Sequence, residues 1–279
     1  MDRLVPICGS LFLTYALATS HSLYSAIYLA TLAVAFVIGY RDRLEMLRVG
    51  LGYCVLASLA ILPAIAFEAN PNYIGCVLAL GLAIAIAYRI WVFIPIAIGG
   101  LAYSQSRGAI LAAGVAIFIV IWQDYKVLAI ALAVGVFFLL AEIIHGSGGA
   151  DSILARLGIW QDTLNHLTIF GSGFGSFADA YPGFSFHTNM TETRASHAYN
   201  DFLELVFELG IGVIPLWFLI TFAFESEDWQ AKLVLTTFGV LSLTYFPFYI
   251  SILGHAFALT LGRLVANPSA QPCLSRNRL

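Results

Sequence analysis

Long apolar stretches follow one another along almost the whole chain, separated by short polar breaks. We identify stretches of near-spanning length at 4–19, 23–40, 49–67, 73–88, 91–103, 109–122, 127–144 and 202–224, followed by a longer one at 232–265. The last is too long for one span, and Phe246-Pro247-Phe248 within it predicts a break, because proline ends or kinks a helix. The pattern predicts an all-α, polytopic membrane protein with about ten transmembrane helices.

Composition supports this interpretation. The chain is 60% apolar and 10% charged, with a mean hydropathy of +0.88, and a soluble domain needs more charge to cover its surface. The four cysteines, Cys8, Cys54, Cys76 and Cys273, lack the spacing of a disulfide or zinc framework. We expect a single membrane domain over 1–279, with membrane lipids as partners, no metal, no cofactor and no nucleic acid.

The basic residues predict the orientation. Lysine and arginine favour cytoplasmic loops. With both termini inside, the cytoplasmic side holds ten of the thirteen basic residues, which are Arg3, Arg41, Arg43, Arg48, Arg89, Lys126, Lys232, Arg263, Arg276 and Arg278. The segment 266–279 is then a polar cytoplasmic tail. Tyr15-Ala16-Leu17-Ala18 resembles a signal-peptidase site; we favour a retained first helix, and cleavage would leave the orientation unchanged.

One long connection, 145–200, lies on the outer (periplasmic) face in this topology, and long loops between packed elements are often functional. Asp151-Ser152 is a candidate cap for a helix whose apolar residues form one stripe: Ile153, Leu157, Trp160, Leu164 and Leu167. We expect this helix to lie in the membrane interface, apolar face down, with Arg156 and Asp162 off the stripe. Three glycines follow, at 171, 173 and 175, where they permit tight turns and close backbone approach; as a phosphate-binding nest they are a weak signal.

The end of this loop carries the densest group of titratable residues. His197, Asp201, Glu204 and Glu208 have spacings that predict one helical face. Such groups are costly in a membrane helix unless they face protein, water or substrate. For Asp201 alone we favour a carboxylate at headgroup level near a helix N-terminus. For His197 with Glu204 and Glu208 we favour a functional role.

Three arginines stand on the outer side, where loops avoid them: Arg107, Arg156 and Arg194. Arg107 begins an apolar stretch, where it either anchors a helix end at the interface or binds an anion, since guanidinium matches phosphate oxygens bidentately. The presence of three favours an anionic ligand on that side.

These residues carry a resemblance to the O-antigen ligase and polymerase family of membrane glycosyltransferases. The stretch 106–109 (SRGA) is similar to a family element that opens a helix. Residues 156–160 (RLGIW) with 169–177 (IFGSGFGSF) resemble its arginine, tryptophan and glycine segment, and 196–210 (SHAYNDFLELVFELG) its histidine and asparagine signature. The matches, including Asn-Pro-Asn at 70–72, follow the family's order.

The resemblance implies a fold like that of C-type glycosyltransferases and a metal-independent enzyme of the bacterial cytoplasmic membrane, acting in lipopolysaccharide biosynthesis. Such an enzyme transfers a glycan from undecaprenyl pyrophosphate to an acceptor hydroxyl on lipid A–core or a similar glycolipid. A polymerase of the same family instead uses another lipid-linked glycan as the acceptor.

The resemblance also implies roles for individual residues. Arg107 and Arg156 would hold the pyrophosphate, and His197 would activate the acceptor hydroxyl or orient the leaving group. Asn200 would position substrate hydroxyls, and Glu204 would support His197. Arg194 either supplements the arginines or is an ordinary loop charge.

The chain departs from the family pattern in two respects. Tyr199 stands where the family has a second histidine, and the chain is shorter, with fewer spans. A transporter or flippase of a lipid-linked or anionic solute is a rival interpretation, but the chain shows no internal repeat and its unusual charges gather at one face. A non-catalytic partner in polysaccharide assembly is a further alternative.

Overall fold

The computed structural model describes residues 4–41, 52–54, 70–124, 149–181 and 195–266. Within these ranges every regular element is helical, which confirms the all-α prediction there. The elements are α1 (Leu4–Ala18), α2 (Leu23–Arg41), α4 (Pro71–Ala87), α5 (Phe93–Ser104), α6 (Arg107–Asp124), α8 (Gly149–Asn165), α9 (Phe177–Ala180), α10 (Asp201–Leu209), η2 (Gly210–Val213), α11 (Ile214–Phe224), α12 (Trp229–Thr244), η3 (Pro247–Tyr249) and α13 (Ser251–Ala266).

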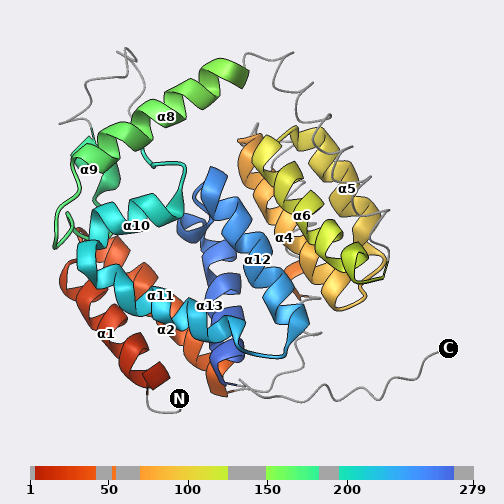
Figure 1. Ribbon diagram of the computed structural model, residues 1–279, viewed down its shortest axis with the longest axis horizontal. Helices are drawn as coiled ribbons and strands as arrows, with labels where there is room; N and C mark the ends of the chain where they lie inside the picture. The colour runs from red at the N-terminus through yellow and green to blue at the C-terminus, as the bar shows by residue number, and fades with distance from the viewer. Residues whose placement is uncertain (1–3, 42–51, 55–69, 125–148, 182–194, 267–279) are drawn as a thin grey trace.

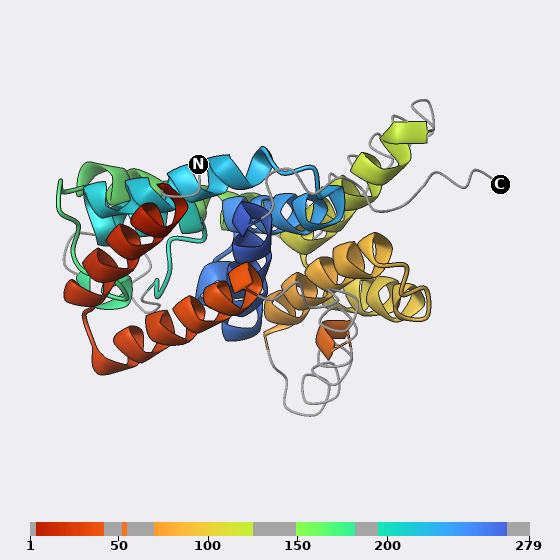
Figure 2. The ribbon, with the colours of Figure 1, turned by 90° about the horizontal axis from the view of Figure 1, so that it is seen from below.

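The helices form two groups joined through α12 and α13. In Figure 1, α4, α5 and α6 stand together on one side, while α1, α2, α10 and α11 stand on the other. Helix α12 packs on α4 and α6, and α13 packs along α2 and against α12. Helix α8 packs on α10 at the edge of the molecule, and the view in Figure 2 again shows them together. Helix α8 therefore contacts the rest of the fold chiefly through α10.

Close backbone approach holds α2 against α13. A Cβ added at Gly39 would collide with the carbonyl oxygen of Leu259, and one at Gly262 would collide with that of Phe36. Small residues at such crossings allow helices in membranes to pack tightly without a large side chain between them. We infer that these two glycines set the separation of α2 and α13.

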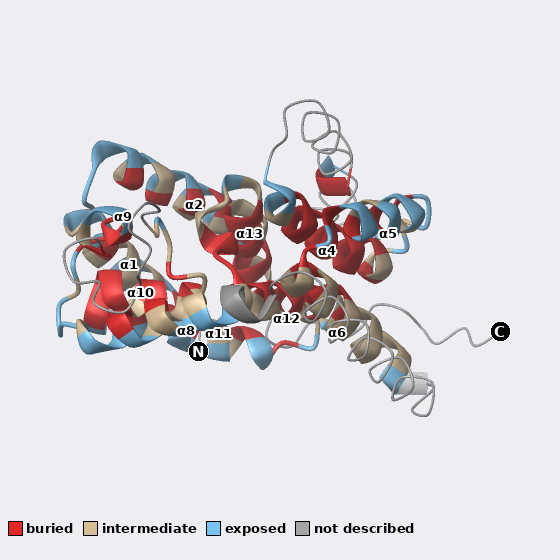
Figure 3. Ribbon diagram, turned by 90° about the horizontal axis from the view of Figure 1, so that it is seen from above, coloured by how far each residue is buried: buried red, intermediate tan, exposed pale blue. Residues whose placement is uncertain are grey.

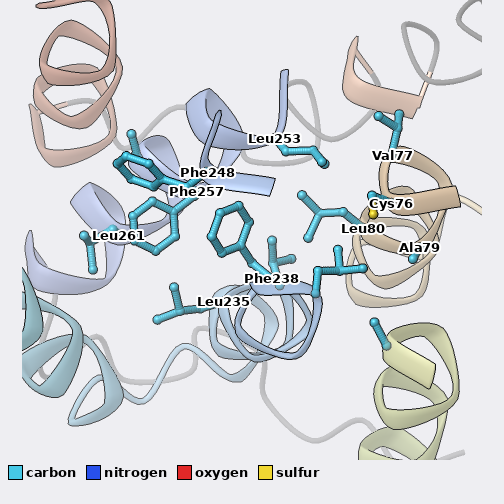
Figure 4. Packing of buried hydrophobic residues seen from close by; sticks show 14 of the residues in the cluster. Cys76, Val77, Ala79, Leu80, Leu235, Phe238, Phe248, Leu253, Phe257 and Leu261 are labelled. Carbon is cyan, nitrogen blue, oxygen red and sulfur yellow. The ribbon is translucent and has the colours of Figure 1, made fainter. Parts of the chain in front are cut away.

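The core lies between α4, α12 and α13. Helix α4 is buried along nearly its whole length, as its red ribbon in Figure 3 shows. Phe238 of α12 stacks on Phe257 of α13 with ring centroids 4.6 Å apart, and Phe248 of η3 meets Phe257 edge to face. Figure 4 shows this aromatic group continuing toward Leu80 of α4. Burial of these large rings supplies much of the apolar stabilisation.

The break predicted at 246–248 is present. Helix α12 ends at Thr244, Tyr245 is extended, and the 3-10 turn η3 begins at Pro247 before α13 starts at Ser251. Proline has no backbone N–H to continue a helix. The turn sends α13 back beside α2, so the aromatic residues 245–249 lie in the interior of the fold rather than within a continuous span.

By length and composition, two helical segments among the described residues qualify to cross a membrane, Leu23–Arg41 and Asp201–Phe224. The other apolar helices in the described ranges are shorter. The predicted spans at 49–67 and 127–144 lie largely or wholly outside those ranges. The figure of about ten spans therefore stays a prediction. The segment expected as one helix over 202–224 is interrupted, because Gly210 takes a φ of 52° and η2 separates α10 from α11.

The predicted helix in the long outer loop exists as α8, but it begins at Gly149, so Asp151-Ser152 lies inside its first turn and not at its cap. Ile153, Leu157 and Leu164 of α8 are exposed, as is Leu167 just beyond the helix, and the contact of this stripe with lipid stays a prediction. Trp160 is an exception, because its indole Nε1–H donates to the carbonyl of Ala198 at 2.8 Å. The stripe therefore also ties α8 to the chain that precedes α10.

Candidate functional site

The chain enters α10 through a short irregular segment at 195–200. Asn200 is the N-cap of α10, and its side-chain oxygen accepts a hydrogen bond from the Leu203 N–H at 3.2 Å. His197 therefore precedes the helix, which corrects the prediction that it shares a helical face with Asp201, Glu204 and Glu208. The cap also occupies the side-chain oxygen of Asn200, the residue expected to position substrate hydroxyls.

His197 and Glu204 form a hydrogen-bonded pair. Nδ1 of His197 lies 2.7 Å from Oε1 of Glu204, and the other carboxylate oxygen accepts the Ala198 N–H at 2.7 Å. Glu204 is fully buried, whereas the His197 side chain is 24% exposed. We assign the proton to Nδ1, because each side-chain oxygen of Glu204 then accepts one donor. Within the described residues Nε2 has no hydrogen-bond partner, so its lone pair is available.

The ring of His197 is covered on one face by Phe246, with centroids 3.8 Å apart and planes 17° apart. Burial lowers the pKa of His197 to about 4, against an opposing influence of Glu208. The imidazole is therefore neutral at pH 7, which is the state required of a general base.

Arg156 projects from α8 into the same neighbourhood. Its Nη1 donates to the carbonyl of Thr244 at 3.1 Å, and its guanidinium lies over the Tyr199 ring, 5.1 Å from the centroid. Tyr199 in turn meets Phe246 edge to face at 5.6 Å, so one aromatic group contacts both Arg156 and His197. In the described residues no carboxylate pairs with Arg156.

Arg107 is the first residue of α6, and this N-terminal end of α6 packs against the C-terminal end of α12. A Cβ added at Gly108 would collide with Oγ1 of Thr244, the residue whose carbonyl accepts Arg156. The pKa of Arg156 is lowered first by burial, while Tyr199 and Tyr245 oppose the shift and the charge of Arg107 adds to it. The structure therefore brings together the two arginines expected to act as a pair. Arg194 lies outside the described residues.

Tyr199, which stands where the resemblance predicts a histidine, has a backbone φ of 55°. A bulky residue rarely adopts this left-handed conformation, and such strain often accompanies functional sites. The conformation places the Tyr199 ring between Arg156 and Phe246. The Tyr199 ring makes a cation–π contact with Arg156. It has no imidazole nitrogen that could exchange a proton with His197.

The other two carboxylates of α10 have structural partners. Oδ2 of Asp201 accepts from Ser242 Oγ at 2.8 Å and from the Phe248 N–H at 2.9 Å, and Asp201 is buried. Asp201 is the first residue of α10, as expected of a carboxylate near a helix N-terminus, and its depth in a membrane stays a prediction. Glu208 accepts from the Phe177 N–H at 3.0 Å and from the Tyr249 hydroxyl at 2.5 Å. These two acids fix α10 to the chain around it.

The glycine segment caps the end of α10. Gly171, Gly173 and Gly175 all have positive φ, as their predicted role in tight turns requires. The N–H of Ser172 donates to the Phe207 carbonyl at 3.1 Å, and that of Gly173 donates to the Glu208 carbonyl at 2.8 Å. Because these two N–H groups satisfy helix carbonyls, they are not available to bind phosphate.

Several site residues escaped sequence reasoning. Phe246 and Tyr249 pack against the ring of His197, and Trp160 donates to the Ala198 carbonyl beside it. The sequence signal for the aromatic residues is their density around the helix break at Phe246-Pro247-Phe248. In the residues described, no group of three histidine, cysteine or acidic side chains is arranged to hold a metal ion.

Comparison with protein-family models and with curated proteins found no match for this chain.

Proposed function

We propose that this chain is a membrane glycosyltransferase of the O-antigen ligase type, with His197 as the base that activates the acceptor. The observation that carries the proposal is the hydrogen bond of 2.7 Å between His197 and the buried Glu204. A neutral histidine oriented by a buried carboxylate, with the other ring nitrogen available, is the arrangement that general-base catalysis needs.

The proposed reaction moves one glycan. The acceptor hydroxyl transfers its proton to Nε2 of His197 as its oxygen bonds to the anomeric carbon of the donor. The bond from that carbon to the pyrophosphate oxygen breaks, and undecaprenyl pyrophosphate leaves with the electron pair. Glu204 stabilises the imidazolium that forms. The acceptor that we favour is lipid A–core or a similar glycolipid.

Arg156 and Arg107 are proposed to bind the pyrophosphate. The leaving group gains negative charge as the bond breaks, and preorganised guanidinium groups stabilise that charge without reorganisation. Within the described structure Arg156 has only a carbonyl and an aromatic ring against it, and an anionic ligand would give its guanidinium a charge partner.

The proposal is tested in cells that depend on this protein. His197→Ala and Arg156→Ala, at wild-type protein levels, are expected to abolish the glycan product, while His255→Ala, which changes a partly exposed histidine on α13, leaves it unchanged. Loss of glycan-capped lipopolysaccharide identifies a ligase. If only chains longer than one repeat unit disappear, the enzyme is the alternative polymerase of the same family.

A transporter or flippase is the second candidate. The interruption at Gly210 between α10 and α11 favours it, because transporters bind solutes at discontinuous helices. Movement of a fluorescent lipid-linked glycan across liposomes, unaffected by His197→Ala, would identify a flippase and contradict the transferase.

A further inference from the structure

A second site lies away from His197, in an apolar cavity of about 320 Å³ between α1, α2, α11 and α13. Its walls are hydrocarbon except for Ser10, Tyr40 and Arg41. Val37 and Tyr40 line the cavity and are 44% and 37% exposed, so the cavity opens at the surface beside α2. An unfilled apolar cavity forfeits the dispersion contacts of its lining.

The length of the cavity matches one half of a bilayer. Its wall along α2 extends from Leu29 to Arg41, which is about 18 Å at the rise of an α-helix. One leaflet contributes about 15 Å to the hydrocarbon core of a membrane. Phe248 also lines the cavity, and its N–H is bonded to Asp201. The cavity therefore reaches from the end of α2 to the packing beneath α10.

The charged residue of the cavity lining, Arg41, lies at one end of the cavity wall along α2. Arg41 is the last residue of α2, a segment long and apolar enough to span a membrane. Within the described ranges Arg41 is exposed and has no hydrogen bond or ion pair. A guanidinium at the end of an apolar channel complements a phosphate attached to a hydrocarbon chain. A water-soluble ligand would find no comparable polar groups along the walls.

We propose that this cavity binds one acyl chain of an anionic phospholipid, with the lipid phosphate at Arg41. With the predicted orientation, that lipid comes from the cytoplasmic leaflet, opposite the His197 site. The site does not depend on the proposed glycosyl transfer. It requires only that α2 lies in a bilayer.

A larger side chain in place of Gly9 on α1 would fill the cavity, because Gly9 lines it. A Cβ there would make ordinary contacts, 3.9 Å from Phe36 and 4.0 Å from Leu219, both of which line the cavity. Gly9→Leu therefore places its side chain in the space of the acyl chain without backbone collision, and leucine also favours a helix more than glycine does. Gly99→Leu on α5 is the matched control, because Gly99 is exposed and has open space around it.

The experiment is native mass spectrometry of the full-length protein released from nanodiscs containing equal amounts of phosphatidylglycerol and phosphatidylcholine. Wild type and Gly99→Leu are expected to retain one phospholipid, enriched at least fivefold in phosphatidylglycerol. Gly9→Leu should lose it. Arg41→Gln should retain a phospholipid but without the preference, and Arg89→Gln, which removes another exposed arginine, should behave as wild type.

Three results would overturn the site. These are wild-type protein that retains no lipid, Gly9→Leu that retains the same lipid as wild type, and a preference that survives Arg41→Gln. Retention of an added polyprenyl phosphate in place of phospholipid would also overturn it. Because the readout is bound lipid, a failed glycosyltransferase assay does not affect the result.

Discussion

Nδ1 of His197 and Oε1 of Glu204 lie 2.7 Å apart although the two residues belong to different local structures, an irregular entry segment and helix α10. Asn200 caps α10 between them, and this turn lets the histidine fold back onto the first turn of the helix. Glu204 has no exposed surface, and its two side-chain oxygens face the histidine and the Ala198 N–H.

Glu204→Gln is expected to lower the initial rate of glycan transfer by about 10²- to 10⁴-fold, the range for losing general acid–base catalysis. The amide cannot stabilise an imidazolium as a carboxylate does. The measurement is product formation in proteoliposomes. The matched control is Glu227→Gln, which makes the same change at an exposed position and should keep the wild-type rate.

The pH dependence follows from the buried imidazole. A base must be unprotonated, and because burial lowers the pKa of His197 to about 4, the active form persists above that pH and is lost as pH falls through it. The acid limb of log kcat/KM is therefore expected near pH 4, well below the ordinary histidine value of about 6.5. An acid limb near 6.5 that moves with substitutions at His197 would show that the ring is solvated and contradict this account.

Phe246 holds that pKa low by covering the ring. Phe246→Leu should expose the imidazole in part and raise its pKa, moving the acid limb upward by a fraction of a unit to one unit or more. The shift is measured with the same pH series. A profile identical to wild type would show that Phe246 does not set the environment of His197.

Arg156→Lys keeps the charge but loses the planar fork that matches phosphate oxygens. We expect KM for the pyrophosphate donor to rise by about tenfold, the effect of about 1.4 kcal/mol of binding energy. Arg89→Lys, at an exposed turn, is the matched control. An unchanged donor KM in Arg156→Lys, together with an unchanged melting temperature, would exclude Arg156 from donor binding.

Gly173→Ala tests the clamp on α10. Gly173 has a φ of 104°, and an added Cβ would lie 2.5 Å from the Thr19 carbonyl oxygen, so we expect a loss of stability of about 1–3 kcal/mol. Gly99→Ala, in open space within a helix, should stabilise by up to about 1 kcal/mol. Thermal unfolding in detergent measures both. A Gly173→Ala protein as stable as wild type would show that the glycine segment does not hold the end of α10.

Sequence reasoning placed most described helices and the break at Phe246-Pro247-Phe248, because apolar stretches and proline leave local signals. It expected Glu204 beside His197, and the two are hydrogen-bonded, but it placed both on one helix. Because Asn200 caps α10, His197 lies outside the helix. The spacing of the polar residues does not show which of them forms the N-cap. The contact of Arg156 with Tyr199 joins α8 to the entry of α10, and such contacts between distant segments carry no local signal.

Sequence reasoning also missed the partners of Asp201 and Glu208. Both carboxylates bond to residues of α12, α9 or the η3 turn, far away in the chain. Periodicity predicts which face a side chain occupies, but the element that packs on that face depends on the whole fold.

The role of His197 as the proton acceptor is tested by comparing the rates of the wild-type and His197→Ala proteins. Purified protein in liposomes is mixed with an undecaprenyl-pyrophosphate-linked glycan and its acceptor, and both the glycosylated product and the released undecaprenyl pyrophosphate are followed over time. Our account predicts that His197→Ala lowers both rates equally, by at least about 10²-fold, while the melting temperature and the His255→Ala control match wild type. A His197→Ala protein that transfers glycan within twofold of the wild-type rate would contradict it.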